Sequence, residues 1–150
     1  HLVDLPGQLA VADKALQAAG LRERASLHPT NLLDDAAALP DGMDLIWMSQ
    51  FLSCFSEEAI ASIFRRVAAA LAPSGQVLVM DTFWDRQRYD IAAYCLINTS
   101  PYFNNLASGN SKVYESEDYV RLAKAAGLDL VTARDGIGYC HSLLRFAKAA

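Results

Sequence analysis

The chain has 150 residues, of which 53% are hydrophobic and 20% are charged, and its formal net charge at pH 7 is −4. This length and composition predict one globular domain with a substantial core and exclude a disordered chain. The negative charge argues against nucleic acid as a partner, and no apolar run reaches the ~18 residues that a membrane-spanning helix needs.

Strand-like and helix-like segments alternate along the chain. Strands are expected at 2–5, 25–28, 44–49, 76–81, 128–132 and 139–147. Helices are expected at 8–19, 56–71, 88–98 and, capped by Ser116, 116–126, with a turn at 73–75 and loops at 31–42 and 98–112. This alternation predicts an α/β domain with a mainly parallel sheet covered on both faces. Only "ARDGIG" joins the last two strands, which is too short for a crossover, so the last strand should run antiparallel to the one before it.

Cysteine and histidine usage bears on redox compartment and metal binding. The three cysteines are widely spaced and form no C-x-x-C motif: Cys54, Cys95 and Cys140. They predict reduced thiols in a cytoplasmic protein. The three histidines are scattered: His1, His28 and His141. A metal site is therefore not expected.

The chain opens with "HLVDLPGQLAVADKALQAAG", in which Asp4 ends a strand just before a helix. In doubly wound folds that bind a nucleoside, an acid at the end of the second strand, ~20 residues after a glycine-rich turn, binds the ribose hydroxyls. Only three residues precede Asp4. We therefore expect the first strand and its glycine-rich turn to be missing from this chain. The alternative is a strand-end acid that caps the following helix.

Three further stretches support a family resemblance. "VDLPGQLAVA" resembles a D-L-P segment, and "DLIWMSQFLSCFSEEAIASIFRRVAAALAPSGQVLVMDT" resembles D-x-x-x-x-S-x-x-L-H-D-W-x-D-E, a helix, then L-x-P-G-G-x-L-L-x-x-E. "VYESEDYVRLAKAAGLDLV" resembles R-T-x-x-E-[FW]-x-x-L-x-x-A-G-F. In this order they resemble the small-molecule O-methyltransferases of the class I S-adenosylmethionine-dependent methyltransferases, typified by the caffeate, acetylserotonin and hydroxyneurosporene enzymes. The ending "GIGYCHSLLRF" is similar to the branch found in bacterial aryl-polyene pigment clusters.

The resemblance implies a Rossmann-like methyltransferase sheet, S-adenosylmethionine as cofactor, and these cofactor-binding residues: Asp4, Leu5, Asn31, Leu32, Ser49 and Gln50. Asp4 would hold the ribose diol, Asn31 would accept the adenine amino hydrogen, and Leu32 would pack on the adenine. Ser49 and Gln50 would face the methionine end. The chain would be the C-terminal part of the catalytic domain, without the N-terminal helical domain through which family members dimerise.

On the substrate side the resemblance implies aromatic walls at Tyr102 and Phe103, and groups that orient a hydroxyl at Asn110 and Tyr114. Residues 104–116 contain no histidine and the last strand carries Arg145, so the histidine–acid pair implied by the resemblance has no counterpart in these segments. His141 is then the expected catalytic base, because it is the histidine on the substrate side. A half-buried strand histidine with a structural partner is the alternative.

Three functions remain open from the sequence. The first is methyl transfer to a hydroxyl, or to an activated ring carbon, of a small aromatic or polyene metabolite. The second is a nicotinamide-dependent reductase, because Asp4 would suit that cofactor's ribose too. The third is a degenerate methyltransferase fold that serves as a binding or dimerising module.

Overall fold

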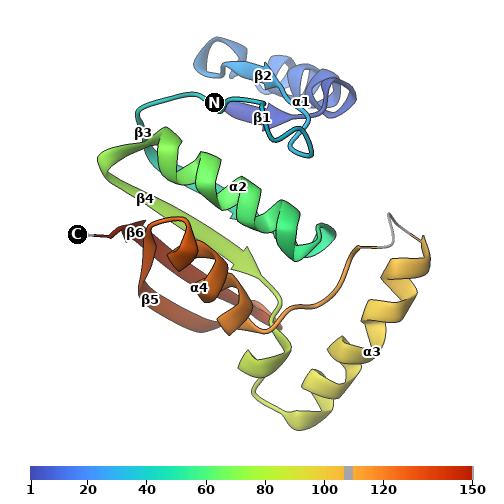
Figure 1. Ribbon diagram of the computed structural model, residues 1–150. Coiled ribbons are helices and arrows are strands. Elements are labelled where there is room, and N and C mark those ends of the chain that lie inside the picture. Colours follow the sequence, from blue (N-terminus) through green and yellow to red (C-terminus); the bar gives the residue numbers. More distant parts are fainter. Residues whose placement is uncertain (107–109, 150) are drawn as a thin grey trace. The chain divides into compact units, whose positions relative to one another are not determined.

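The computed structural model describes residues 1–106 and 110–149, and the chain divides into two compact units, His1–Asp41 and Gly42–Ala150. The strands form two sheets, with the orders β1-β2 and β3-β4-β6-β5 (Figure 1). Among the described residues, no helix has both the length and the apolar character that crossing a membrane requires.

The first unit is a short βαβ motif. Strands β1 (Leu2–Asp4) and β2 (Leu27–Pro29) pair in parallel, and helix α1 (Pro6–Ala18) with the 3-10 turn η1 (Arg22–Arg24) connects them. A parallel pair needs such a crossover. Proline at the first helical position suits the start of α1. The strand predicted at 25–28 is observed at Leu27–Pro29, so its start was predicted two residues early and its end one residue early.

The second unit contains the larger sheet, formed by β3 (Met43–Ser49), β4 (Leu71–Asp81), β5 (Leu128–Ile137) and β6 (His141–Lys148). Strands β3 and β4 are parallel, whereas β6 runs antiparallel to both of its neighbours, β4 and β5. This arrangement confirms the predicted antiparallel last strand. It also brings the start of β6 to the carboxyl end of β4, where Ser142 lies opposite Asp81.

Helices α2 (Glu57–Ala70) and α4 (Ser116–Ala125) contact each other and cover the same face of this sheet (Figure 1). The core between them is centred on Phe64, whose ring meets Tyr119 and Phe146 edge-on at centroid distances of 6.5 and 5.9 Å. All three side chains are fully buried. Burial of such aromatic area dominates the stability of a small core. The helix α2 begins where Ser56 accepts a hydrogen bond from the Ala59 amide.

Helix α3 (Asp90–Leu106) corrects the prediction of a helix at 88–98 followed by a loop. It continues through Pro101, although proline removes a helical donor. Polar side chains supply donors to carbonyl oxygens of the same helix: Asn98 to Tyr94 at 2.7 Å, Thr99 to Leu96 at 2.6 Å and Asn105 to Pro101 at 2.9 Å. The polar side chains that indicated a loop therefore find hydrogen-bond acceptors within the helix.

The boundaries of β4 and β5 were also predicted wrongly. The predicted turn at 73–75 lies within β4, at the point where its pairing with β3 shifts register between Met43–Leu71 and Leu45–Gln76. A Cβ atom on Gly75 would lie 2.5 Å from the Met43 carbonyl oxygen. Strand β5 continues five residues past Thr132 because β6 pairs with it as far as Ile137 and His141.

The start of α4 differs from its prediction as well. Ser116 is the first helical residue rather than the cap. Its amide and hydroxyl donate to the carboxylate of Asp85 at 2.9 and 2.5 Å, so the capping oxygen comes from 31 residues earlier in the chain. Asp85 belongs to the 3-10 turn η3 (Trp84–Arg86) that follows β4.

Candidate functional site

The carboxyl ends of β3 and β4 meet at one edge of the larger sheet, where ligands bind in open α/β sheets. Strand β3 ends at Ser49, and Gln50 takes the left-handed conformation with φ of 48°, which is rare for a residue other than glycine. Its amide donates to the Met80 carbonyl oxygen at 2.7 Å, which fixes the turn. The chain then forms the 3-10 helix η2 (Leu52–Cys54) beside the end of β4.

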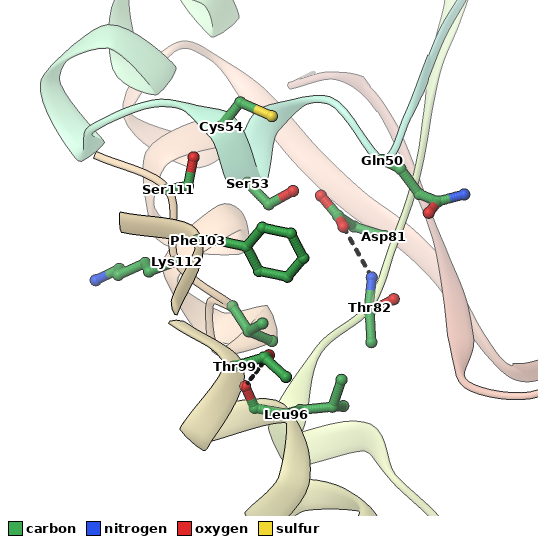
Figure 2. Close-up of a pocket in the computed structure, with 11 residues that line it drawn as sticks. Gln50, Ser53, Cys54, Asp81, Thr82, Leu96, Thr99, Phe103, Ser111 and Lys112 are labelled. Atoms are coloured by element: carbon green, nitrogen blue, oxygen red, sulfur yellow. Dashed lines mark hydrogen bonds between the residues drawn. The ribbon is translucent and has the colours of Figure 1, made fainter. Parts of the chain in front are cut away.

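A cavity of about 380 Å³ lies at this edge, within the size range of small-molecule sites (Figure 2). One side is polar and comes from the strand ends and η2: Gln50, Ser53, Cys54, Asp81 and Thr82. The other side comes from α3 and the segment before α4: Leu96, Thr99, Phe103, Ser111, Lys112 and Val113. The cavity therefore sets a polar wall against a partly apolar one.

Asp81 is the acidic group of the polar wall. It is 4% exposed, and its carboxylate accepts hydrogen bonds from the Thr82 amide at 2.9 Å and from the Tyr119 hydroxyl at 3.0 Å. Burial raises the pKa of Asp81, and hydrogen bonds from Thr82, Tyr119 and Ser53 partly oppose that rise. A buried carboxyl group that lines a cavity is typical of functional sites.

Ser53 and Cys54 lie next to this carboxylate. The hydroxyl of Ser53 is directed toward Asp81 (Figure 2), and interaction with Ser53 lowers the pKa of Asp81. Burial raises the pKa of the Cys54 thiol, and the charge of Asp81 raises it further. Cys54 is therefore a neutral thiol near pH 7 and not a thiolate nucleophile.

The opposite wall contains an aromatic ring and a cation. The ring of Phe103 extends from α3 into the space facing Ser53 (Figure 2), and its side chain is 51% exposed. The ammonium of Lys112 lies 3.3 Å from Glu57 and 4.3 Å from the centre of the Tyr114 ring. Figure 2 shows this ammonium directed away from Asp81, so its charge is balanced outside the cavity.

Two of the sequence-predicted residues, Gln50 and Phe103, line this cavity. Ser49 ends β3 beside it, and His141 begins β6 half-buried, opposite Ile137, without lining it. Tyr102 and Asn110 are exposed and do not line it either.

Tyr114 has a structural environment. It is 2% exposed, and its hydroxyl donates to the Phe55 carbonyl oxygen at 2.6 Å. Burial, together with the nearby charge of Glu57, raises the pKa of Tyr114 to about 12. The predicted roles of Tyr114 and His141 toward substrate stay predictions.

The remaining predicted residues belong to the first unit. The Asp4 carboxylate is exposed at the carboxyl end of β1 and accepts a hydrogen bond from the Leu5 amide at 2.7 Å. One carboxylate can accept several hydrogen bonds, so Asp4 keeps the capacity to bind two hydroxyl groups. The side-chain oxygen of Asn31 accepts from the Leu33 amide at 3.0 Å, which forms an Asx turn. Leu32 is half-buried.

Ser53 and Asp81 were not predicted from the sequence, although the family motifs contain a signal for both. Aligning D-x-x-x-x-S-x-x-L-H-D-W on Asp44 puts Ser53 at the motif's histidine. Aligning L-x-P-G-G-x-L-L-x-x-E on Leu71 puts Asp81 at its glutamate. Within residues 1–106 and 110–149, no cluster of three or more histidine, cysteine or acidic residues is arranged to hold a metal ion.

Comparison with known proteins adds to this geometry. The mitomycin biosynthesis 6-O-methyltransferase of Streptomyces lavendulae is 27% identical over 86 residues, which are 57% of this chain and 24% of that protein. The structure of the mitomycin 7-O-methyltransferase MmcR matches 99% of this chain and 41% of its own, with a TM-score of 0.81 and 19% identity. The O-methyltransferase NcsB1, in complex with S-adenosylmethionine and 2-hydroxy-5-methyl naphthoic acid, matches with a TM-score of 0.74 and 23% identity, over 97% of this chain and 40% of its own.

The chain thus spans about a quarter of the curated relative and about two fifths of the solved ones. The TM-scores of 0.81 and 0.74 show that the chain shares the fold of these neighbours. A model of the O-methyltransferase domain matches residues 1–129. The chain therefore belongs to the O-methyltransferase domain family.

Proposed function

We propose that this chain is the C-terminal part of the catalytic domain of an S-adenosylmethionine-dependent O-methyltransferase. Its substrate is a hydroxyl group of a small aromatic or polyene metabolite, bound in the cavity at the ends of β3 and β4. The observation that carries the proposal is a buried carboxyl group, Asp81, in a cavity of substrate size at the carboxyl edge of a methyltransferase sheet. The family match supports the reaction class.

We further propose that the whole protein is a cytoplasmic homodimer with an N-terminal helical domain. The strand that precedes β1 in this fold, together with its glycine-rich turn, would belong to the same larger protein. The partial coverage of the solved relatives, 40% and 41%, supports this extent. The edge of β3 that is not bonded to β4 would then pair with the strand that we expect to precede β1 in the larger protein.

The cofactor, when bound, supplies an electrophilic methyl group on a positively charged sulfur. The first unit offers Asp4 for its ribose and Asn31 and Leu32 for its adenine, with Leu5 beside the ribose. The exposed carboxylate of Asp4 fits a diol, which needs an acceptor of two hydrogen bonds. Ser49 and Gln50 would face the methionine end.

The residues of the cavity then act on the substrate. Phe103 offers an aromatic surface to a planar ring. Asp81, directly or through the hydroxyl of Ser53, accepts the proton of the substrate hydroxyl as its oxygen attacks the methyl carbon. When bound, the cofactor would supply the methyl group for the new carbon–oxygen bond, and its sulfur would keep the electron pair of the broken carbon–sulfur bond. Alignment of the two reacting atoms supplies much of the rate.

His141 is the competing candidate for the base. If it takes the proton, His141→Ala should lower turnover while leaving cofactor affinity within about twofold. Retention of turnover in that variant would leave Asp81 as the acceptor.

The proposed function is tested on the full-length protein. Calorimetry should show binding of S-adenosylmethionine, and mass spectrometry should show methoxy products from a panel of hydroxylated aromatic compounds. Cofactor binding without turnover of any compound would favour the degenerate binding module. Absence of cofactor binding would contradict the proposal.

A further inference from the structure

The proton acceptor of the cavity is a carboxyl group. Because a carboxylate is a weak base, it can deprotonate only hydroxyl groups that are themselves fairly acidic. Asp81 lines the cavity and is 4% exposed, and the hydroxyl of Ser53, which also lines the cavity, is directed toward it (Figure 2). A hydroxyl group can accept a hydrogen bond from substrate while it donates one to a carboxylate. Ser53 is therefore placed to pass a substrate proton to Asp81.

The other groups around this path do not provide a stronger base. Cys54 and Tyr119 face Asp81 from η2 and α4, and the pKa of each is raised, so both stay protonated near pH 7. Tyr114, on the segment before α4, keeps its proton for the Phe55 carbonyl oxygen. Lys112 is directed away and is paired with Glu57 (Figure 2). Among the described residues that line the cavity, the carboxylate is thus the proton acceptor.

The acidity of ordinary phenols does not match this acceptor. A phenol has a pKa of ~10 and a carboxyl group one of ~4, so transfer between them in water is uphill by about six pKa units. Burial raises the pKa of Asp81 and narrows this gap, but hydrogen bonds from Thr82, Tyr119 and Ser53 act in the opposite direction. General base catalysis is most effective when the pKa of the base suits the group that it deprotonates.

We propose that the substrate hydroxyl of this site is an acidic one: an enol conjugated with a carbonyl group, a hydroxyquinone, or a phenol acidified by a conjugated acceptor. This inference rests on the proposed function and narrows its substrate class. Such a hydroxyl binds by donating to Ser53 or Asp81, with the proton shared between oxygens of similar acidity. As the oxygen attacks the methyl carbon, the proton ends on the Asp81 carboxylate and is then released to water.

The shape of the cavity is consistent with this class. Its polar side, formed by Ser53, Asp81 and Thr82, would face the hydroxyl and its conjugated carbonyl. Its other side contains Leu96 and the ring of Phe103, which would face the flat carbon skeleton. A bicyclic ring with the hydroxyl and the carbonyl on one edge presents this same division.

The test compares isomers that share a ring but differ in acidity, with the unaltered full-length enzyme. The first pair is 4-hydroxycoumarin, an enol whose acidity is near that of a carboxyl group, and 6-hydroxycoumarin, an ordinary phenol. The second pair is 2-hydroxy-1,4-naphthoquinone and 1-naphthol. The methoxy products and S-adenosylhomocysteine are quantified at pH 7.5, and cofactor binding is measured by calorimetry in the same preparation.

We expect kcat/KM for the acidic member to exceed that of the phenol by at least about 100-fold in one or both pairs, the low end of what a general base contributes. Equal rates, or faster methylation of the phenols, would overturn the substrate class and leave the proposed function standing. Cofactor binding with no methylation of any of the four compounds would also overturn it. Failure to bind S-adenosylmethionine would overturn the proposed function and this inference together.

Discussion

The hydroxyl of Tyr119 on α4 donates a hydrogen bond of 3.0 Å to Oδ2 of Asp81 at the end of β4, and both side chains are buried. This contact ties the acid of the cavity to the aromatic core, because the Tyr119 ring also packs against Phe64 and Phe83. The carboxylate is thereby held in one orientation beside Ser53. A preorganised acceptor of this kind loses little on binding substrate.

The variant Asp81→Asn tests how much the buried carboxylate of Asp81 lowers the free energy of unfolding. Burial raises the pKa of Asp81 in the folded state above its value in the unfolded state. The carboxyl group therefore contributes to the free energy of unfolding at low pH, and this contribution is lost as pH rises through the folded-state pKa. At pH 7 the variant has no buried charge to desolvate. Its side-chain amide can still accept a hydrogen bond from Thr82 and donate one to Tyr119. We expect its urea midpoint to exceed that of the parent at pH 7, with the difference shrinking toward pH 4.

The matched control is Asp44→Asn, at an exposed position on β3. A lower midpoint for Asp81→Asn at pH 7 would show that the hydrogen bonds to the carboxylate outweigh its desolvation.

Ser53→His tests the match between acceptor and substrate. An imidazole has a pKa of ~6.5 and is a stronger base than a carboxylate. The variant should gain turnover of 1-naphthol relative to 2-hydroxy-1,4-naphthoquinone, with a rate that rises with pH through about 6.5. An unchanged ratio of the two rates, in a variant that still binds S-adenosylmethionine, would contradict the prediction.

Phe64→Ala should be among the most destabilising single substitutions. The side chain is fully buried between two aromatic rings, and Phe→Ala at such sites costs about 3–5 kcal/mol. Phe103→Ala is the control, since that ring is 51% exposed and should cost less than about 1 kcal/mol. Urea unfolding followed by circular dichroism gives both values, and similar costs would be inconsistent with this core.

Gly75→Ala should disturb the pairing of β3 with β4. The added Cβ would meet the Met43 carbonyl oxygen at 2.5 Å and Leu71 Cδ2 at 2.8 Å, and a backbone atom cannot move aside cheaply. We expect a loss of about 1–3 kcal/mol in the free energy of unfolding. Gly7→Ala, with no atom within 4 Å of the new Cβ, should be neutral or stabilising. A neutral Gly75→Ala variant would disprove the close approach.

Asp4→Ala should weaken S-adenosylmethionine binding by about 1.5–3 kcal/mol, the scale of a charged hydrogen-bonding group. Asp41→Ala, which removes another exposed acid from the same unit, is the control for a general charge effect. Calorimetric affinities that fall equally in both variants would refute a specific ribose contact.

The order of elements and the antiparallel last strand could be predicted because they depend on hydrophobic pattern and connection length. The mainly parallel sheet was predicted wrongly, because β6 pairs antiparallel with both β4 and β5 in the four-stranded sheet. The short link "ARDGIG" allowed only an antiparallel hairpin, which β5 and β6 confirm. The end of α3 could not be predicted in this way. Asn98, Thr99 and Asn105 are typical loop residues, and only the folded helix shows that their side chains bond to its own carbonyl groups.

The candidate site was predicted only in part, for a physical reason. Gln50 and Phe103 were expected from the family resemblance, and both line the cavity. Asp81 looked like the last residue of an apolar strand, and its importance arises from burial against Tyr119, which lies 38 residues away. His141 was predicted to be the base because histidine is the usual base near neutral pH. The cavity is instead lined by Ser53, whose residue type does not indicate a base.

The cap that Asp85 provides for α4 has a consequence for the order of folding. A helix of ten residues is marginal in water, and its first turn is the costly step in forming it. Because the oxygen that satisfies the Ser116 amide comes from a turn 31 residues earlier, α4 gains this stabilisation only after β4 and η3 have reached their final positions. We therefore expect α4 to form late, as a consolidation step whose rate depends on loop closure between η3 and α4 and not on local helix propensity.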